Sequence, residues 1–195
     1  MNNQPAILAA YNNAAWCDVI CRAHGRPGQF SPELWINHQA TPPYYPNAVS
    51  LIGAEGCAVQ VAQLAELVRE GSLEEWAVKD SFCTLDLAER GFRILFEAEW
   101  IYRSATLPKP DFAMTDVQWR RIDQPFDLVM WEAAWAGESI DKFATHQAIF
   151  MPLLLADLDI AFVAAYQAEQ IIAGAIANRT QGVVGLSNVF CATTA

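Results

Sequence analysis

Residues 53–58, Gly-Ala-Glu-Gly-Cys-Ala, have the composition of a turn that can bind an anion. They follow the apolar run 45–52, which predicts a strand, and they overlap the start of the amphipathic run 57–70, which predicts a helix. The first backbone N–H groups of a helix lack partners within the helix and carry partial positive charge, so such a junction can hold phosphate. Glu55 opposes that chemistry because it places a carboxylate in the turn. An ordinary strand-to-helix turn is the alternative interpretation.

Glu97 and Glu99 form a second candidate for chemistry. Residues two apart on a strand point to the same face, and two carboxylates on one face can act as general acid and general base. The strand predicted for them is 92–103, in which alternate residues such as Phe96 and Trp100 supply a buried face. The same pattern also describes a strand whose carboxylates only face water.

The cysteines give weaker signals. They are odd in number and show no CxxC spacing, which indicates a reducing compartment. Cys17 and Cys21 lie one helical turn apart and could share a metal with His24, but no fourth ligand is evident. Small residues on a buried helical face are the preferred interpretation, and no metal site is predicted.

Composition limits the function further. The chain has 195 residues, 53% of them hydrophobic, including seven Trp and ten Phe, which is enough for a packed core. Its net charge is −10 and it has no cluster of Lys or Arg, so we expect neither nucleic acid nor membrane as a partner. No apolar run reaches about 20 residues, and residues 1–5 lack the basic region of a signal peptide. A cytoplasmic location is expected.

The pattern of elements divides the chain into two parts, 1–108 and 112–195, joined by a proline-containing linker within 104–114. The first part is predicted to contain helices over 5–23 and 57–70, a short helix over 85–90, and strands over 34–37, 45–52, 75–79 and 92–103. The second part is predicted to contain a strand over 115–122, helices over 125–136 and 146–156, and strands Ile160–Tyr166, Ile171–Asn178 and Val183–Phe190.

The last three strands organise the second part. Their connections are too short for a crossover helix, so the strands form an antiparallel meander. Their nearly continuous apolar character predicts helices on both faces of the sheet. The expected fold class is therefore α/β (α+β), with a mixed, mostly antiparallel sheet flanked by helices.

The amino-acid sequences of these strands resemble those of a known family. A strand containing AGAIAN, a polar turn and then VVGLSNVF resembles the central strands of the GNAT superfamily of acyl-CoA-dependent N-acyltransferases. The order of elements in 112–195 is similar to the first half of that fold, and 45–103 resembles its second half in reduced form. In the family, the third of these strands leads into a signature of Arg or Gln, two residues, Gly, one residue and Gly or Ala, which holds the pyrophosphate of acetyl-CoA. Only residues 191–195 follow Phe190, and they do not contain this signature.

The resemblance implies two GNAT-like parts and transfer of an acetyl group from acetyl-CoA to an unknown small-molecule amine. The residues that it implies for the cofactor are Gly53, Ala54, Gly56, Cys57 and Ala58. Gly53 stands where the signature has Arg or Gln, so any binding of coenzyme A is expected to be weak. Ser187 and Asn188 lie where family enzymes sometimes place an acidic base, and neither side chain can act as one.

A non-catalytic binding or assembly module derived from an acetyltransferase is the alternative function. It is favoured by the missing pyrophosphate signature. In a complete GNAT domain the strand 183–190 has a further neighbour, which this sequence does not supply after it. Because an open apolar edge promotes aggregation, we expect this edge to be covered by the first part of the chain or by a second copy in a homodimer.

Overall fold

The chain folds as two compact units, Met1–Tyr102 and Arg103–Ala195. The structure is a computed structural model. The residues that it describes are 4–71, 75–110, 116–143 and 148–192. Each unit combines helices with a four-stranded sheet, so the protein is of the mixed α/β class, with two sheets that are largely antiparallel. None of the described helices has the length and apolar character needed to span a bilayer.

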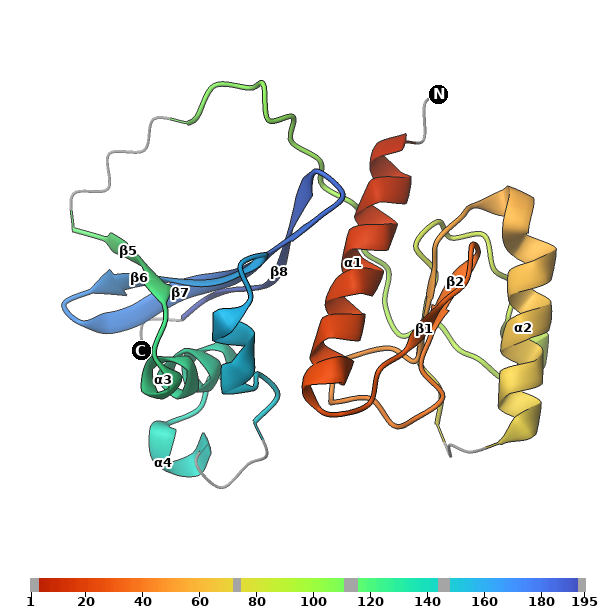
Figure 1. The fold of residues 1–195 in the computed structure, drawn as a ribbon, viewed down its shortest axis with the longest axis horizontal. Helices are drawn as coiled ribbons and strands as arrows, with labels where there is room; N and C mark the ends of the chain where they lie inside the picture. The colour runs from red at the N-terminus through yellow and green to blue at the C-terminus, as the bar shows by residue number, and fades with distance from the viewer. Residues whose placement is uncertain (1–3, 72–74, 111–115, 144–147, 193–195) are drawn as a thin grey trace. The chain divides into compact units, whose positions relative to one another are not determined.

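The first unit is a sheet between two helices (Figure 1). Its elements are α1 (Gln4–Ala23), β1 (Gln29–Phe30), β2 (Leu34–Ile36), β3 (Ala48–Ser50), α2 (Cys57–Glu70) and β4 (Val78–Lys79). The strands lie in the order β1-β2-β3-β4, and only the pair β3 and β4 is parallel. This parallel pairing requires a crossover connection, which α2 provides.

The two faces of this sheet pack against different helices. Leu34 of β2 points to α2 and forms a buried core with Leu64 and Leu67. Trp35, the next residue, points to the opposite face, where its indole N–H donates a hydrogen bond to Asp18 of α1. Because successive side chains of β2 point to opposite faces, this strand contacts both helices and holds the sheet between them.

The second unit is an antiparallel sheet whose strands follow chain order, β5-β6-β7-β8 (Figure 1). Its elements are β5 (Gln118–Ile122), α3 (Pro125–Ala136), α4 (Ile140–Phe143), β6 (Ile160–Gln167), β7 (Gln170–Thr180) and β8 (Val183–Cys191). The register places Ile122, Phe162 and Ile176 side by side across β5, β6 and β7. The antiparallel meander predicted for the last three strands is confirmed.

Trp131 of α3 is the centre of the core of this unit. Its fully buried ring meets Phe150, Phe162 and Phe190 edge to face, with centroid distances of 5.6, 5.3 and 5.3 Å. Its indole N–H donates a 2.9 Å hydrogen bond to the carbonyl of Val163 on β6. One side chain thus supplies both the apolar packing and the polar contact that fix α3 on the sheet.

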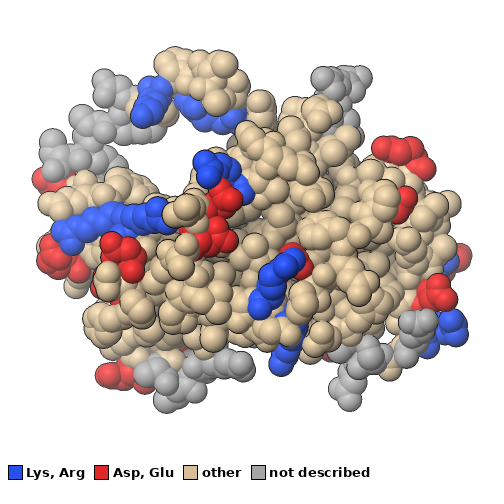
Figure 2. All heavy atoms as spheres, viewed as in Figure 1, with Lys and Arg blue, Asp and Glu red and all other residues tan. Residues whose placement is uncertain are grey.

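The predicted helices over 5–23, 57–70 and 125–136 are confirmed as α1, α2 and α3. The strands expected over 45–52 and 75–79 are shorter, and the expected short helix over 85–90 is a single 3₁₀ turn at Ala88–Arg90. The strand expected over 115–122 begins at Gln118, and residue 115 lies outside the described residues. In the view of Figure 2, charged side chains form separate small groups among uncharged atoms.

The strand predicted over 92–103 is wrong. The backbone there is not part of either sheet, and residues 93–103 are exposed. The alternating sequence satisfies the local requirement for a strand, but a strand also needs a neighbour for its backbone N–H and C=O groups. Among the described residues, this segment has no such neighbour.

The helix predicted over 146–156 is also wrong. Residues 146 and 147 lie outside the described part, residues 148–151 are irregular, and only Pro152–Ala156 forms a 3₁₀ turn. The carboxylate of Glu132 explains the irregular backbone, because it accepts hydrogen bonds from the N–H groups of Ile149 and Phe150 at 2.7 and 3.2 Å. These N–H groups are therefore held by a side chain instead of by helical carbonyls.

Among the described residues of the second unit, helices do not cover both faces of the meander, contrary to the prediction. α3 packs on the face that bears Phe162 and Phe190. The opposite face carries apolar side chains that are largely exposed, namely Trp119 (64%), Val184 (63%), Leu186 (68%) and Val189 (67%). The apolar run of β8 thus reflects an open apolar face, which a sequence cannot distinguish from a buried one.

Candidate functional site

The Gly53–Ala58 junction connects β3 to α2. A 3₁₀ turn at Ala54–Gly56 runs directly into α2, and the N–H of Gly56 donates to the carbonyl of Gly53 at 3.1 Å. Ala54, Glu55 and Ala58 are exposed, and Cys57 is half-buried. The structure therefore forms the strand, turn and helix that the sequence predicts at this junction.

The glycine at position 56 packs against protein. A Cβ atom built on Gly56 would lie 2.1 Å from Cδ1 of Ile52 and 2.5 Å from its Cγ1. The amide of Gln60, which is fully buried, donates to the carbonyls of Ile52 and Glu33 at 2.9 and 3.0 Å. The close approach that requires glycine at 56 is therefore made by the side chain of Ile52.

The charge at this junction is negative. A Cβ atom on Gly53 would lie 3.3 Å from a carboxylate oxygen of Glu55, so this side chain turns back over the start of the turn. Glu55 is the acidic residue of the 3₁₀ turn, and the first turn of α2 contains no acidic residue. The positive end of the helix dipole is thus already faced by a carboxylate of the protein.

Ser187 and Asn188 lie at a β-bulge in β8. Gly174 pairs with Phe190 whereas Ile176 pairs with Ser187, so β8 has one residue more than β7 over this stretch. Asn188 has a left-handed backbone conformation with φ of 50°. The hydroxyl oxygen of Ser187 is buried and has no hydrogen-bond partner among the described residues. The bulge lies in a strand that contains no acidic residue.

Glu97 and Glu99 are both exposed in the extended segment 92–102. They do not lie in a sheet among the described residues. The geometry therefore supports the solvent-facing interpretation of this pair.

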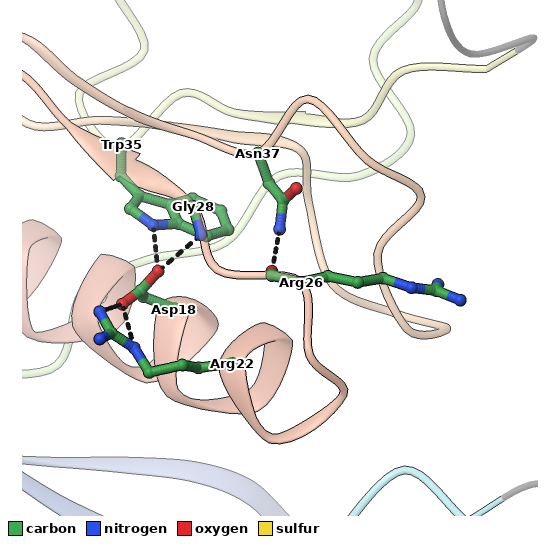
Figure 3. Close-up of polar contacts among 6 residues, drawn as sticks. All are labelled: Asp18, Arg22, Arg26, Gly28, Trp35 and Asn37. Carbon is green, nitrogen blue, oxygen red and sulfur yellow. Dashed lines mark hydrogen bonds and ion pairs between the residues drawn. The ribbon is translucent and has the colours of Figure 1, made fainter.

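Asp18 is a buried acid that the sequence analysis did not select. Figure 3 shows it on α1 between the loop at Gly28 and the indole of Trp35. One carboxylate oxygen accepts hydrogen bonds from the Gly28 N–H at 2.8 Å and from Trp35 Nε1 at 3.1 Å. The other accepts from Arg22. Because each oxygen already has a partner, Asp18 fastens α1 to the sheet and is not placed for chemistry.

Two cysteines lie near this acid in sequence. Burial raises the pKa of Cys17 to about 12 and that of Cys21 to about 11, so both thiols are protonated at neutral pH. Among the described residues, no group of three or more His, Cys, Asp or Glu side chains could hold a metal ion. The sequence signal for Asp18 was an acidic residue in a helix whose other buried residues are mostly apolar.

No protein-family model and no curated protein matches the sequence.

The five residues Gly53, Ala54, Gly56, Cys57 and Ala58 do lie together, with Ile52 packed against Gly56 and the carboxylate of Glu55 over Gly53. Unpaired strand backbone is the more prominent chemical feature. It occurs in segment 92–102 and on the outer edges of β5 and β8, the terminal strands of the second sheet.

Proposed function

We propose that this protein is a non-catalytic binding and assembly module whose fold derives from an acyl-CoA-dependent N-acyltransferase of the GNAT type. The observation that carries the proposal is the combination of unpaired strand backbone with exposed apolar side chains. Segment 92–102 presents Ile94, Phe96 and Ile101 with exposed fractions of 80%, 80% and 95%. Backbone and side chains of this kind bind other strands through main-chain hydrogen bonds and apolar contacts.

The relation to acyltransferases is supported by the second unit. Its strand β5, helix α3 and three antiparallel strands, with sheet order β5-β6-β7-β8, follow the order that the sequence resemblance implies, although the second helix expected over 146–156 does not form. The bulge at Asn188 falls where, by the resemblance, family enzymes sometimes place an acidic base. Neither feature requires activity, because a fold can persist after its site is lost.

The resemblance implies two sites, the Gly53–Ala58 junction and the bulge in β8, and the residues at both support a loss of activity. At the junction after β3, Ile52 fills the space beside Gly56 and Glu55 repels a diphosphate. At the bulge of β8, Ser187 and Asn188 offer no group that could take a proton from an ammonium substrate at neutral pH.

Sedimentation velocity over a wide range of protein concentrations tests the proposal, together with an assay for release of free coenzyme A from acetyl-CoA. The proposal predicts reversible self-association or stable dimers and no release above the uncatalysed rate with a panel of primary amines. A chain that is monomeric at every concentration and transfers acetyl groups would contradict it.

An acetyltransferase that binds acetyl-CoA weakly is the second candidate, and one observation favours it. The strand, glycine turn and helix at Gly53–Ala58 is the only junction of its kind among the described residues, and it exposes Ala54 and Ala58. Calorimetric titration with coenzyme A tests this candidate. Glu55→Gln removes the repelling charge and is expected to strengthen binding, whereas Glu66→Gln, on the third turn of the same helix, is not. Heats that neither substitution changes, or no heat at all, would contradict binding at this junction.

A further inference from the structure

Residues 93–99 form an exposed stretch of extended backbone. All of them are exposed, and residues 92–104 contain no helix, strand, turn or bend. In the described part of the chain, residues 93–99 have no hydrogen-bond partner. Hydrogen bonding ends at Phe92, whose N–H donates at 3.3 Å to a carbonyl at the start of the preceding 3₁₀ turn, and resumes at Trp100, whose indole N–H donates to the carbonyl of Ser81 at 2.9 Å. The stretch is therefore held at both ends and free between them.

A peptide in this form can enter a cleft that binds strands. Such clefts pair with the main-chain N–H and C=O groups of an extended peptide and take its side chains in pockets. Helices and paired strands must unfold locally before they can enter, whereas residues 93–99 have no hydrogen bonds to described residues to break. Endoproteases bind their substrates in clefts of this kind, and exposed chain outside regular structure is where they cleave folded proteins.

The apolar side chains of the stretch specify the pocket. Ile94, Leu95 and Phe96 follow one another directly and are 80%, 71% and 80% exposed. Phe96 is the largest of the three and the central residue of 93–99, so extended chain lies on both sides of it. A deep apolar pocket in a protease selects such a residue before the bond that is cleaved. The stretch therefore fits a protease of apolar specificity.

The charged residues of the stretch define the rest of the cleft. Arg93, Glu97 and Glu99 are exposed and form no ion pair with a described residue. Glu97 directly follows Phe96, and Glu99 comes two residues later. A cleft with carboxylates on that side is excluded because like charges repel each other.

We propose that residues 93–99 are a processing site at which an endoprotease of apolar specificity hydrolyses the peptide bond between Phe96 and Glu97. The C–N bond breaks, and water supplies the hydroxyl of the new carboxyl group on Phe96 and a proton of the new amine on Glu97. The reaction needs no other reactant. This site goes beyond the assembly function proposed above and does not depend on it.

The cut lies between the elements of the two units. The last element of the first unit is the 3₁₀ turn Ala88–Arg90, and β5, the first of the second unit, begins at Gln118. Trp100 stays on the carboxyl-terminal fragment, whereas the carbonyl of Ser81 and the ammonium of Lys79, 4.6 Å from the ring centre, stay on the other. Cleavage therefore leaves each sheet and its helices complete, and Trp100 is then bound to the first unit by noncovalent contacts alone.

Two other exposed aromatic residues show that exposure alone does not select the site. Phe126 is 71% exposed, but it is the second residue of α3, so its backbone is helical. Tyr44 is 83% exposed, but it lies in a turn with φ of 71°, and the N–H of Tyr45 donates to the carbonyl of Pro42 there. Neither residue has extended chain on both sides. They are therefore internal comparisons for Phe96.

Limited digestion of the whole chain with chymotrypsin, which has an apolar pocket, tests the proposal. Mass spectrometry should find fragments 1–96 and 97–195 first, at a rate at least about tenfold higher than cleavage after Phe126 or Tyr44. If the bonds after Phe126 or Tyr44 are cut as fast as the bond after Phe96, the protease gains access through unfolding of the protein, and the proposed site is wrong.

Two substitutions at one position test the specificity. Glu97→Pro removes the N–H of the bond to be cleaved and puts a ring in its place, so the cut after Phe96 should be lost. The fold should tolerate this change, since residue 96 is already extended and residue 97 has no hydrogen bond to a described residue. Glu97→Ala is the matched control and should be cut as fast as the wild type. Resistance of both variants would show that the glutamate, and not the apolar extended chain, is recognised.

Digestion at several protein concentrations separates this site from the assembly function. A stretch that pairs in an assembly becomes protected as the concentration rises, but it is cut when the chain is dilute. Resistance of the bond after Phe96 in the dilute, monomeric chain overturns the processing site. Rapid cleavage of a chain that stays monomeric at every concentration supports the processing site and overturns only the assembly function.

Discussion

The side chain of Ile52 occupies the space beside Gly56, where an added Cβ atom would lie 2.1 Å from Cδ1 of Ile52. Gly56→Ala should therefore lower the free energy of unfolding by about 1–3 kcal/mol through overpacking. In an Ile52→Ala background the loss should be smaller, because the clash is removed. A double-mutant cycle by chemical denaturation measures this difference. Equal losses in both backgrounds would contradict the packing role.

Asp18 is predicted to be a structural acid. Asp18→Ala leaves the half-buried N–H of Gly28 and the buried indole N–H of Trp35 without their acceptor, so it should lower the free energy of unfolding by about 2–4 kcal/mol. Arg22→Ala is the matched control, since the Arg22 side chain is 66% exposed and its loss should cost less than about 1 kcal/mol. If the two substitutions lower the free energy of unfolding equally, the stabilisation comes from the Asp18–Arg22 ion pair and not from the hydrogen bonds that Asp18 accepts from Gly28 and Trp35.

Glu132 should stabilise the irregular segment before Pro152. Its carboxylate is 2% exposed and accepts from Ile149 and Phe150, so Glu132→Ala should cost about 2–4 kcal/mol. Glu132→Gln keeps one acceptor oxygen and should cost less. Amide hydrogen exchange at 149 and 150 gives the local measurement. Exchange that stays slow in Glu132→Ala would mean that other groups hold these amides.

The cysteine thiols are predicted to differ in reactivity according to their burial. Cys83 and Cys191 are exposed and should react quickly with a thiol reagent in the native protein, whereas Cys17 and Cys21 should react only on unfolding. Peptide mapping after brief labelling identifies the modified residues. Rapid native labelling of Cys17 would contradict its burial.

The same two thiols give a pH dependence of stability. Their pKa values are raised to about 12 and about 11 by burial, so the unfolded chain ionises them first as the pH rises above about 8.5. Their contribution is present below that pH and is lost as the pH rises towards the raised values. A Cys17→Ala and Cys21→Ala double variant should therefore lose less stability between neutral and alkaline pH than the wild type.

Helices and their ends could be predicted because their signals are local. α2 and α3 end where Gly71 and Gly137 take left-handed conformations, with φ of 55° and 69°, and both glycines are visible in the sequence. The meander was also predictable, since its short turns leave no choice but antiparallel neighbours.

The two main errors arose where distant residues decide the structure. Segment 92–103 has the alternation of a strand, but whether it pairs depends on a neighbour that no local pattern reveals. The irregular backbone at Ile149 and Phe150 depends on Glu132, which lies 17 and 18 residues before them in the sequence. At the candidate site, the junction was predictable, but the filling of its space by Ile52 was not.

Hydrogen exchange measured by mass spectrometry at several protein concentrations tests assembly through unpaired strands most directly. Peptides that cover residues 93–99 and 118–122 should exchange rapidly at low concentration and become protected together as concentration rises, while the buried strand β6 stays protected throughout. Unchanged rapid exchange of residues 93–99 at all concentrations, including those at which the chain associates, would contradict the account.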